Sequence, residues 1–303
     1  MAFMEKCYSV TMTSSSKPSR IIGRYAPSPT GELHLGNLRT ALLAWLSVRK
    51  QGGEFRLRME DLDTPRVVKG SADQILKDLE WLGLDWDGPV MYQSSRIEAY
   101  EQAMKELGDK GLIYPCFCSR KDIQQSASAP HGKTAVYAGT CRALSDAERE
   151  QRTLFKSPAF RVVVSGGLMV DVGDFVIKRA DHLFAYQLAV VVDDLAQSVN
   201  EVVRGADLIS STARQTYLLK HLSVTGERIN YRHAPLMMDN KGQRLSKRDG
   251  SASIRQWRNA GGTADELLAL LIKSVGVEFD GDTISALELL DVISGSSLRS
   301  VFM

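Results

Sequence analysis

The sequence lacks the features that would place it in a membrane, outside the cell or on nucleic acid through charge alone. No apolar run approaches the roughly 20 residues that a membrane-spanning helix needs. Four cysteines are too few for the disulfide framework of a secreted protein. The formal net charge is only +2, so contact with RNA would require a local basic patch. Residues 1–19 contain no apolar central stretch, which predicts a disordered leader instead of a signal peptide, and a cytoplasmic protein.

Strand and helix patterns alternate in the first hundred residues. We expect a strand at 21–25, a helix from 36 to the glycine pair 52–53, and a strand at 54–60. Two further helices are expected at 71–82 and 95–107. The last of these helices is expected to open with a capping box of Ser95 and Glu98. This alternation predicts an α/β fold with a parallel sheet covered by helices.

The pattern changes in the middle of the chain, where cysteines, a polar loop and short strands replace the alternation. These strands are expected near 160–164, 168–172 and 175–178. We therefore expect a discontinuous catalytic domain over 20–113 and 183–240, interrupted by an inserted subdomain over 114–182. Residues 241–303 are expected to form a basic loop and a short helical tail, without an anticodon-binding domain.

A proline-stiffened turn leads from the first strand into the first helix: Arg24-Tyr-Ala-Pro-Ser-Pro-Thr-Gly-Glu-Leu-His34-Leu-Gly36-Asn37. The start of a helix presents backbone N–H groups and the positive end of the helix dipole to a phosphate. His34 can donate to a phosphoryl oxygen as charge develops, Gly36 lets a base approach the backbone, and Asn37 can bind sugar or phosphate. A lone histidine at a helix start is more often structural, so a second signal is needed.

A basic loop about two hundred residues later supplies that signal: Arg244-Leu-Ser-Lys247-Arg248. Clustered cations on a loop suit the pyrophosphate that leaves when ATP reacts, and lysine serves as a movable point charge. Alone, such a pentamer would more often be a solvated loop or a nucleic-acid patch. Together the two segments resemble the paired signatures of class I aminoacyl-tRNA synthetases, His-Ile-Gly-His and Lys-Met-Ser-Lys-Ser, with Asn37 and Arg244 as departures.

This resemblance implies a Rossmann-type catalytic core that uses ATP with Mg²⁺. It implies that His34 and Lys247 are catalytic, and that ATP is bound by His34, Gly36, Asn37 and Lys247. It assigns no general base to a transfer step.

Longer matches narrow the resemblance to the glutamyl branch of that class. They are Arg24-x-Ala-Pro-Ser-Pro-Thr-Gly, Arg58-x-Glu60-Asp61-Leu-Asp63, the run from Phe184 to Asp194, and Val203-Arg204-Gly-Ala-Asp-Leu. By analogy the glutamate pocket is lined by Arg24, Ala26, Ser28, Glu60, Tyr186 and Arg204. Arginines can bind carboxylates in bidentate geometry, Glu60 can face the ammonium, and Tyr186 can add a neutral hydrogen bond. Asp193 and Asp194 are expected to be structural residues that close an apolar element.

Three of the cysteines, Cys116, Cys118 and Cys141, lie within 26 residues of sequence, which in a reducing compartment favours a metal over a disulfide. Together with Tyr137 they resemble the structural zinc site of a family of short paralogues, the glutamyl-Q tRNA(Asp) synthetases, in which a tyrosine takes the fourth position. His131 is an alternative fourth ligand. Three reduced cysteines without a metal are the remaining alternative.

The resemblance to this paralogue family covers nearly the whole chain from about Ile21. Only 55 residues follow Arg248, too few for the anticodon-binding domain of full-length glutamyl-tRNA synthetases. The family activates glutamate without tRNA and attaches it to the queuosine base at the wobble position of tRNA(Asp). The resemblance therefore implies glutamate, ATP and queuosine-bearing tRNA(Asp) as partners of a monomer.

Three other functions are open to the sequence. The chain could be a truncated enzyme that charges the terminal adenosine of a tRNA, a tRNA-binding paralogue without catalysis, or a nucleotidyltransferase that makes a small metabolite.

Overall fold

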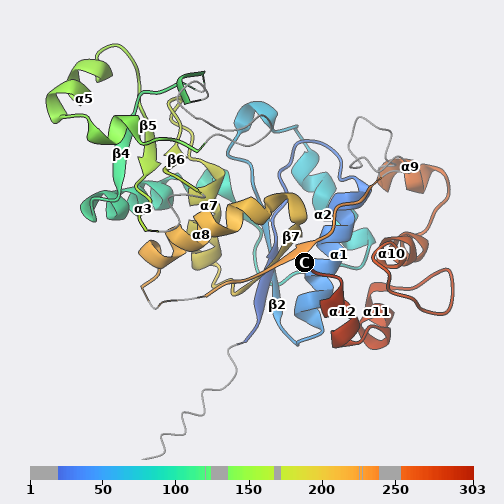
Figure 1. The fold of residues 1–303 in the computed structure, drawn as a ribbon. Coiled ribbons are helices and arrows are strands. Elements are labelled where there is room, and N and C mark those ends of the chain that lie inside the picture. The colour runs from blue at the N-terminus through green and yellow to red at the C-terminus, as the bar shows by residue number, and fades with distance from the viewer. Residues whose placement is uncertain are drawn as a thin grey trace, which may run out of the picture.

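The computed structural model describes residues 20–119, 121–123, 136–166, 172–224, 226, 228–238 and 254–303 (Figure 1). The strands are β1 (Ile22–Tyr25), β2 (Glu54–Met59), β3 (Met91–Tyr92), β4 (Ile113–Cys116), β5 (Ala159–Val162), β6 (Phe175–Lys178), β7 (Glu201–Gly205) and β8 (Asn230–Ala234). The α-helices are α1 (Leu35–Arg49), α2 (Ser71–Trp81), α3 (Ile97–Asp109), α5 (Asp146–Thr153), α7 (Tyr186–Ala196), α8 (Ile209–Leu222), α9 (Ile254–Asn259), α10 (Ala264–Lys273), α11 (Ala286–Val292) and α12 (Gly295–Ser300).

The central sheet has five strands in the order β3-β2-β1-β7-β8, and every neighbouring pair is parallel. This confirms the α/β parallel-sheet fold predicted from the sequence. From β1 the chain first adds strands on one side, and later β7 and β8 on the other side. Ligands of doubly wound sheets bind at such a switch point, outside the carboxyl ends of the strands. The carboxyl ends of β1 and β7 therefore mark the expected position of a site.

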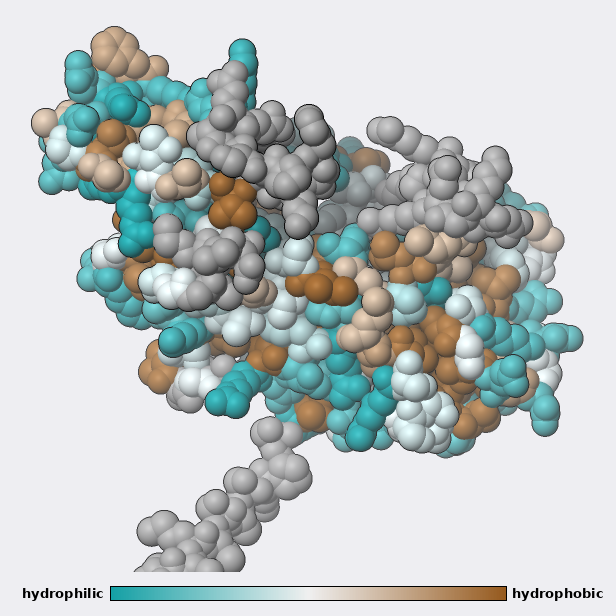
Figure 2. All heavy atoms as spheres, in the orientation of Figure 1, coloured by the Kyte–Doolittle hydropathy of each residue, from teal (hydrophilic) through white to brown (hydrophobic). Residues whose placement is uncertain are grey.

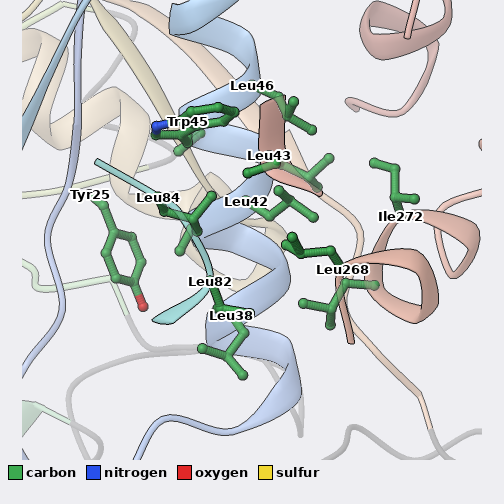
Figure 3. Close-up of a cluster of buried hydrophobic side chains, with 14 of the residues drawn as sticks. Tyr25, Leu38, Leu42, Leu43, Trp45, Leu46, Leu82, Leu84, Leu268 and Ile272 are labelled. Atoms are coloured by element: carbon green, nitrogen blue, oxygen red, sulfur yellow. The ribbon is translucent and has the colours of Figure 1, made fainter. Parts of the chain in front are cut away.

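Helix α1 lies between the sheet and the C-terminal helices. Ten of its fifteen residues are buried, as expected for a helix that is apolar on nearly all sides. Figure 3 shows Leu42 and Leu43 of α1 facing Leu268 and Ile272 of α10. The largest apolar core thus fixes α1, and with it the turn that enters α1 from β1.

A second sheet is antiparallel, with the strand order β4-β5-β6. It belongs to a part of the molecule that projects at the upper left of Figure 1. Val162 of β5 and Ile177 of β6 pack in one core with Leu188 of α7 and Leu218 of α8. The strand expected near 168–172 lies almost entirely outside the described residues.

The predicted capping box at Ser95 is wrong. Helix α3 begins at Ile97 with Arg96 at its N-cap. Ser95 instead ends a short 3-10 helix that starts at Gln93, and its hydroxyl donates to the Tyr92 carbonyl at 2.8 Å. Ser95 therefore belongs to the turn before α3 and does not occupy the N-cap position that the pattern predicts.

The described part of the chain has no helix that is both long and apolar enough to cross a membrane. Figure 2 shows hydrophilic and hydrophobic residues interspersed over this face of the molecule.

The packing of α1 predicts a large loss of stability when its buried face is truncated. Leu42 is fully buried in the core, so Leu42→Ala should lower the free energy of unfolding by about 2–5 kcal/mol. Leu287 on α11 is 70% exposed, so Leu287→Ala should change it by less than about 0.5 kcal/mol. Urea titration of both variants measures the difference. Equal losses would contradict the placement of α1 in the core.

Candidate active site

A cavity of about 690 Å³ opens where β1 and β7 end. Its walls come from the turn after β1, the first turn of α1, the start of α7 and the segments that follow β7 and β8. It brings together all the described residues that the sequence predicts for binding ATP or glutamate: Arg24, Ala26, Ser28, His34, Gly36, Asn37, Glu60, Tyr186 and Arg204. Segments about 180 residues apart in sequence thus share one site at the predicted edge of the sheet.

His34 is the N-cap residue of α1. Its Nδ1 accepts the backbone N–H groups of Gly36 at 3.1 Å and Asn37 at 3.3 Å. The Asn37 side chain accepts the backbone N–H of His34 at 3.4 Å, which completes a capping box. Backbone amides only donate, so Nδ1 carries the lone pair and a neutral ring has its proton on Nε2. This tautomer can donate a hydrogen bond to a phosphoryl oxygen.

The cap corrects one expectation about the start of this helix. The N–H groups of Gly36 and Asn37 are expected to meet a phosphate directly, but they are bound by His34. Gly36 also has a local purpose, because a Cβ atom there would lie only 3.1 Å from His34 Cε1. Glycine leaves room for the imidazole ring, while the approach of a base to Gly36 stays a prediction.

Arg24 is held in place by Asp194, a residue that does not line the cavity. It lies on β1, is 4% exposed, and its Nε donates to Asp194 Oδ1 at 3.2 Å. Among the described residues no hydrogen bond uses its two terminal nitrogens, although Arg24 lines the cavity. One edge of the guanidinium group is therefore fixed, and the terminal nitrogens can bind a carboxylate in bidentate geometry.

Arg204, at the end of β7, has only neutral partners within the described part of the chain. It donates to the Gln215 side chain, to Thr212 Oγ1 at 2.8 Å and to His233 Nε2 at 3.2 Å, and it lies over the Tyr231 ring. Burial lowers the pKa of Arg204 because its charge lacks compensation from these groups. Burial and the charge of Arg204 also lower the pKa of His233, which keeps that ring neutral. The site therefore holds a buried cation that suits an anionic ligand.

Glu60 and Tyr186 complete the polar wall. Glu60 directly follows β2, and its Oε1 lies 3.6 Å from Arg58 Nη2. Burial raises the pKa of Glu60, while the charges of Arg58 and Arg24 act in the opposite direction. Tyr186 opens α7, and burial raises its pKa, so its hydroxyl stays neutral and can donate. Together with Arg24 and Arg204, these two residues offer a carboxylate, a phenol and two guanidinium groups to a ligand.

Two residues that matter for this site are missed by the sequence analysis, Arg58 and Asp194. Their side chains are 0% and 1% exposed, and Arg58 Nη1 donates to Asp194 Oδ1 at 2.8 Å. The pattern treats Asp193 and Asp194 as the end of an apolar element, but α7 continues to Ala196. A carboxylate inside an apolar run must be buried and needs a cation, and this rule could have marked Asp194, although not its partner Arg58.

Some predicted site residues lie outside the described residues. They are Arg244 and Lys247 of the basic loop and His131, the alternative metal ligand. Their roles stay predictions from the sequence.

Cys116, Cys118 and Cys141 converge in the projecting part of the molecule. Their sulfur atoms lie within 4.8 Å of one another, with 3.5 Å between those of Cys118 and Cys141. Tyr137 Oη lies 3.4 Å from Cys116 Sγ and 3.5 Å from Cys118 Sγ. A tetrahedral zinc ion with bonds of about 2.3 Å separates its sulfur ligands by roughly 3.8 Å. The four side chains therefore fit a closed tetrahedral metal site.

The surroundings of the cysteines also suit a metal. The backbone N–H of Phe117 donates to Cys141 Sγ at 3.4 Å, and Arg161 Nε donates to Cys116 Sγ at 3.2 Å. Burial raises the pKa of Cys118 to about 11, so a thiolate there needs a nearby cation at neutral pH. Donors directed at sulfur are the outer partners expected around metal-bound thiolates.

Comparison with known proteins gives consistent results. Residues 20–285 match the model of the family described as tRNA synthetases class I (E and Q), catalytic domain. The chain is 50% identical over 267 residues to the glutamyl-Q tRNA(Asp) synthetase of Nocardia farcinica, covering 84% of this chain and 85% of that protein. It is 48% identical over 267 residues to the glutamyl-Q tRNA(Asp) synthetase of Geobacter sulfurreducens, covering 84% of each.

Solved structures show a similar fold. The glutamate-tRNA synthetase from Elizabethkingia anophelis has a TM-score of 0.75 at 23% identity, covering 93% of this chain and 66% of that chain. The glutamate tRNA ligase from Elizabethkingia meningosepticum, solved in complex with its amino acid, has a TM-score of 0.73 at 23% identity with the same coverage. The chain thus spans about two thirds of the length of these structures.

Proposed function

Because the chain belongs to the family of class I tRNA synthetases (E and Q), it is a ligase of the aminoacyl-tRNA synthetase type, and we propose that it activates glutamate with ATP. It then transfers the glutamate to the queuosine base of tRNA(Asp). The observation with the most weight is the single cavity that joins His34 to two buried arginines. The names of the relatives support the choice of tRNA.

Glutamate would be recognised by charge and geometry together. The terminal nitrogens of Arg24 and the guanidinium group of Arg204 would bind carboxylate oxygen, Glu60 would face the ammonium, and Tyr186 would donate from its hydroxyl. Ala26 and Ser28 would line the same wall. Because the described partners of Arg204 are neutral, glutamate would supply the missing negative charge, which the uncharged amide of glutamine does not.

The first step would be formation of glutamyl-adenylate. A carboxylate oxygen of glutamate attacks the α-phosphorus of ATP, the bond to the bridging oxygen breaks, and pyrophosphate leaves. His34 would donate from Nε2 to the α-phosphoryl group, and Lys247 would stabilise the departing pyrophosphate. Mg²⁺ bound with ATP would offset part of the negative charge of the phosphates. Gly36 and Asn37 would line the nucleotide side of the cavity.

The second step would be ester formation on the tRNA. A hydroxyl of the queuosine cyclopentene ring attacks the acyl carbonyl, loses its proton, and AMP leaves with the electron pair of the broken bond. The anticodon loop would enter the pocket where longer relatives receive the acceptor end of their tRNA.

Zinc would have a structural role in this protein. We assign Cys116, Cys118, Tyr137 and Cys141 as its ligands, since their atoms converge at tetrahedral distances. A site closed by four protein ligands has no open position for water, so the ion would stabilise the fold instead of taking part in the reaction. Its binding energy would serve as folding energy for the segment that the ligands connect.

His34 gives a direct test of the activation step. His34→Ala should lower glutamate-dependent pyrophosphate exchange by about 10²–10³-fold, and the lost cap should cost about 1 kcal/mol of stability. His34→Asn keeps an oxygen that can accept the same N–H groups, so it should stay stable while exchange stays low. Wild-type exchange in the asparagine variant would contradict the assignment of His34.

The metal ligands predict linked losses of zinc and stability. Cys118→Ser should bind less zinc, measured by elemental mass spectrometry, and should unfold at a lower temperature. Cys7→Ser is the matched control, since the sequence resemblance to the zinc site does not include Cys7, and it should keep the zinc content of the wild type. Full zinc content in the Cys118 variant would refute its assignment as a ligand.

Transfer of labelled glutamate tests the whole function. The protein would be incubated with ATP, Mg²⁺ and radiolabelled glutamate, together with tRNA(Asp) with queuosine, tRNA(Asp) without it, or tRNA(Glu). The expected result is label on the queuosine-bearing tRNA alone, which survives removal of the terminal adenosine. Label on tRNA(Glu) that is lost with that adenosine would indicate a charging enzyme instead. Pyrophosphate release without label on any RNA would indicate a small-molecule product, and no ATP turnover a binding protein.

A further inference from the structure

Two arginines of the cavity wall, one on β1 and one on β7, are equally buried but differently paired. Both Arg24 and Arg204 are 4% exposed. Arg24 Nε donates to Asp194 Oδ1 at 3.2 Å, whereas Arg204 has neutral partners among the described residues. A buried cation without a carboxylate is unfavourable until an anion arrives. Of these two arginines, Arg204 is therefore the one whose charge lacks a carboxylate. Arg39 of α1, which also lines the cavity, donates to Ser274 and to the Pro235 carbonyl.

Arg58 completes an ion cluster behind the cavity wall. Its Nη1 donates to Asp194 Oδ1 at 2.8 Å, and its Nη2 lies 3.6 Å from Glu60 Oε1. Burial raises the pKa of Asp194, but the charges of Arg24 and Arg58 outweigh burial and hold this pKa below its ordinary value. Three guanidinium groups, those of Arg24, Arg58 and Arg204, thus face two carboxylates, those of Asp194 and Glu60. The carboxylate of Asp193, 4.0 Å from Arg58 Nε, is balanced by Arg96 at 3.1 Å. One positive charge is left when both carboxylates are ionised.

Glutamate matches this excess charge. With two carboxylates and one ammonium it has a net charge of −1 at neutral pH. Glutarate, which has the same carbon chain and both carboxylates but lacks the ammonium, has a net charge of −2. The two ligands therefore differ in the charge that they bring to the cavity.

We propose that Asp194 is a positioning residue that sets the charge selectivity of the glutamate pocket, a role that rests on the proposed function. Asp194 fixes Arg24 by its Nε edge, so that the terminal nitrogens face the ligand. It also cancels one of the buried positive charges, so that the pocket suits a ligand of net charge −1 and disfavours one of −2. Discrimination against glutarate then comes from the total charge of the cluster as well as from the contact of Glu60 with the ammonium.

Asp194→Asn separates this role from a purely structural one. Asp194 Oδ2 has no hydrogen-bond partner among the described residues, so the amide nitrogen can take its place without displacing a bond. The substitution raises the positive charge of the cluster by one. The ratio of the dissociation constant of glutarate to that of glutamate, measured by isothermal titration calorimetry on the full chain, should fall by about tenfold. A residue needed only for folding would weaken both ligands alike and leave the ratio unchanged, which would overturn the proposal.

Arg58→Gln makes the opposite change and gives a second test if the asparagine variant does not fold. It removes one positive charge from a residue outside the cavity lining, so the same ratio should rise by about tenfold. The double variant Arg58→Gln/Asp194→Asn restores the net charge and should return the ratio to the wild-type value. A ratio that does not move in Arg58→Gln would contradict the charge account.

Asp193→Asn is the matched control. Asp193 precedes Asp194 on the same helix and is 0% exposed, and its hydrogen bonds go to residues outside the cavity lining: Gln93, Arg96 and Tyr100. Its Oδ2 also lies 4.0 Å from Arg58 Nε, a longer contact than the 2.8 Å hydrogen bond between Arg58 and Asp194. This variant should lose stability and change the ratio by less than Asp194→Asn does, because Arg96 balances Asp193 and Asp193 does not contact Arg24. An equal change in both aspartate variants would overturn the assignment to Asp194. Calorimetry needs no turnover, so a wild-type protein that binds glutamate without transferring it would contradict the proposed function alone.

Discussion

A buried ion cluster is the constraint on which the site depends. Arg24 on β1, Arg58 on β2 and Asp194 on α7 meet in a place where none is more than 4% exposed. Removing ions from water costs several kcal/mol each, and a partner left unpaired there would cost still more. These residues therefore specify how α7 lies against the first two strands. The same contacts fix the edge of Arg24 that faces away from the cavity, so the packing of the fold and the binding of a ligand share one set of bonds.

His34, Arg204 and the cysteines are held in place by other kinds of contact. His34 serves as the N-cap of α1, which the largest apolar core fixes in place, so its ring is oriented by the two backbone amides that it accepts. Arg204 is held by neutral side chains of α8 and β8. Around the cysteines the core is small, with Tyr114, Phe117 and Tyr137 as its largest members. A core of this size contributes little stability, so the binding energy of a metal would add to the folding free energy there.

Much of this architecture could be predicted from the sequence, and the misses have physical reasons. The helix over Leu35–Arg49 and the strands beside it follow from periodicity and glycine boundaries, which are local signals. The predicted glutamate and ATP residues that the structure describes all reach one cavity, because the motifs follow strand ends and begin helices. Asp194 and Arg58 are missed because their pairing joins positions 136 residues apart, which no local pattern encodes. The cap at His34 is missed because the motif suggests phosphate binding, while the geometry gives two of the amides to the imidazole ring.

A crystal structure with a non-reactive analogue of glutamyl-adenylate, glutamyl-sulfamoyl adenosine, would test the central claim most directly. The account predicts that the side-chain carboxylate of the analogue lies between Arg24 and Arg204, with its ammonium facing Glu60. The sulfamoyl group, which takes the place of the phosphoryl group, should accept a hydrogen bond from His34 Nε2. An analogue whose carboxylate contacts neither arginine, or whose sulfamoyl group lies away from His34, would contradict the account.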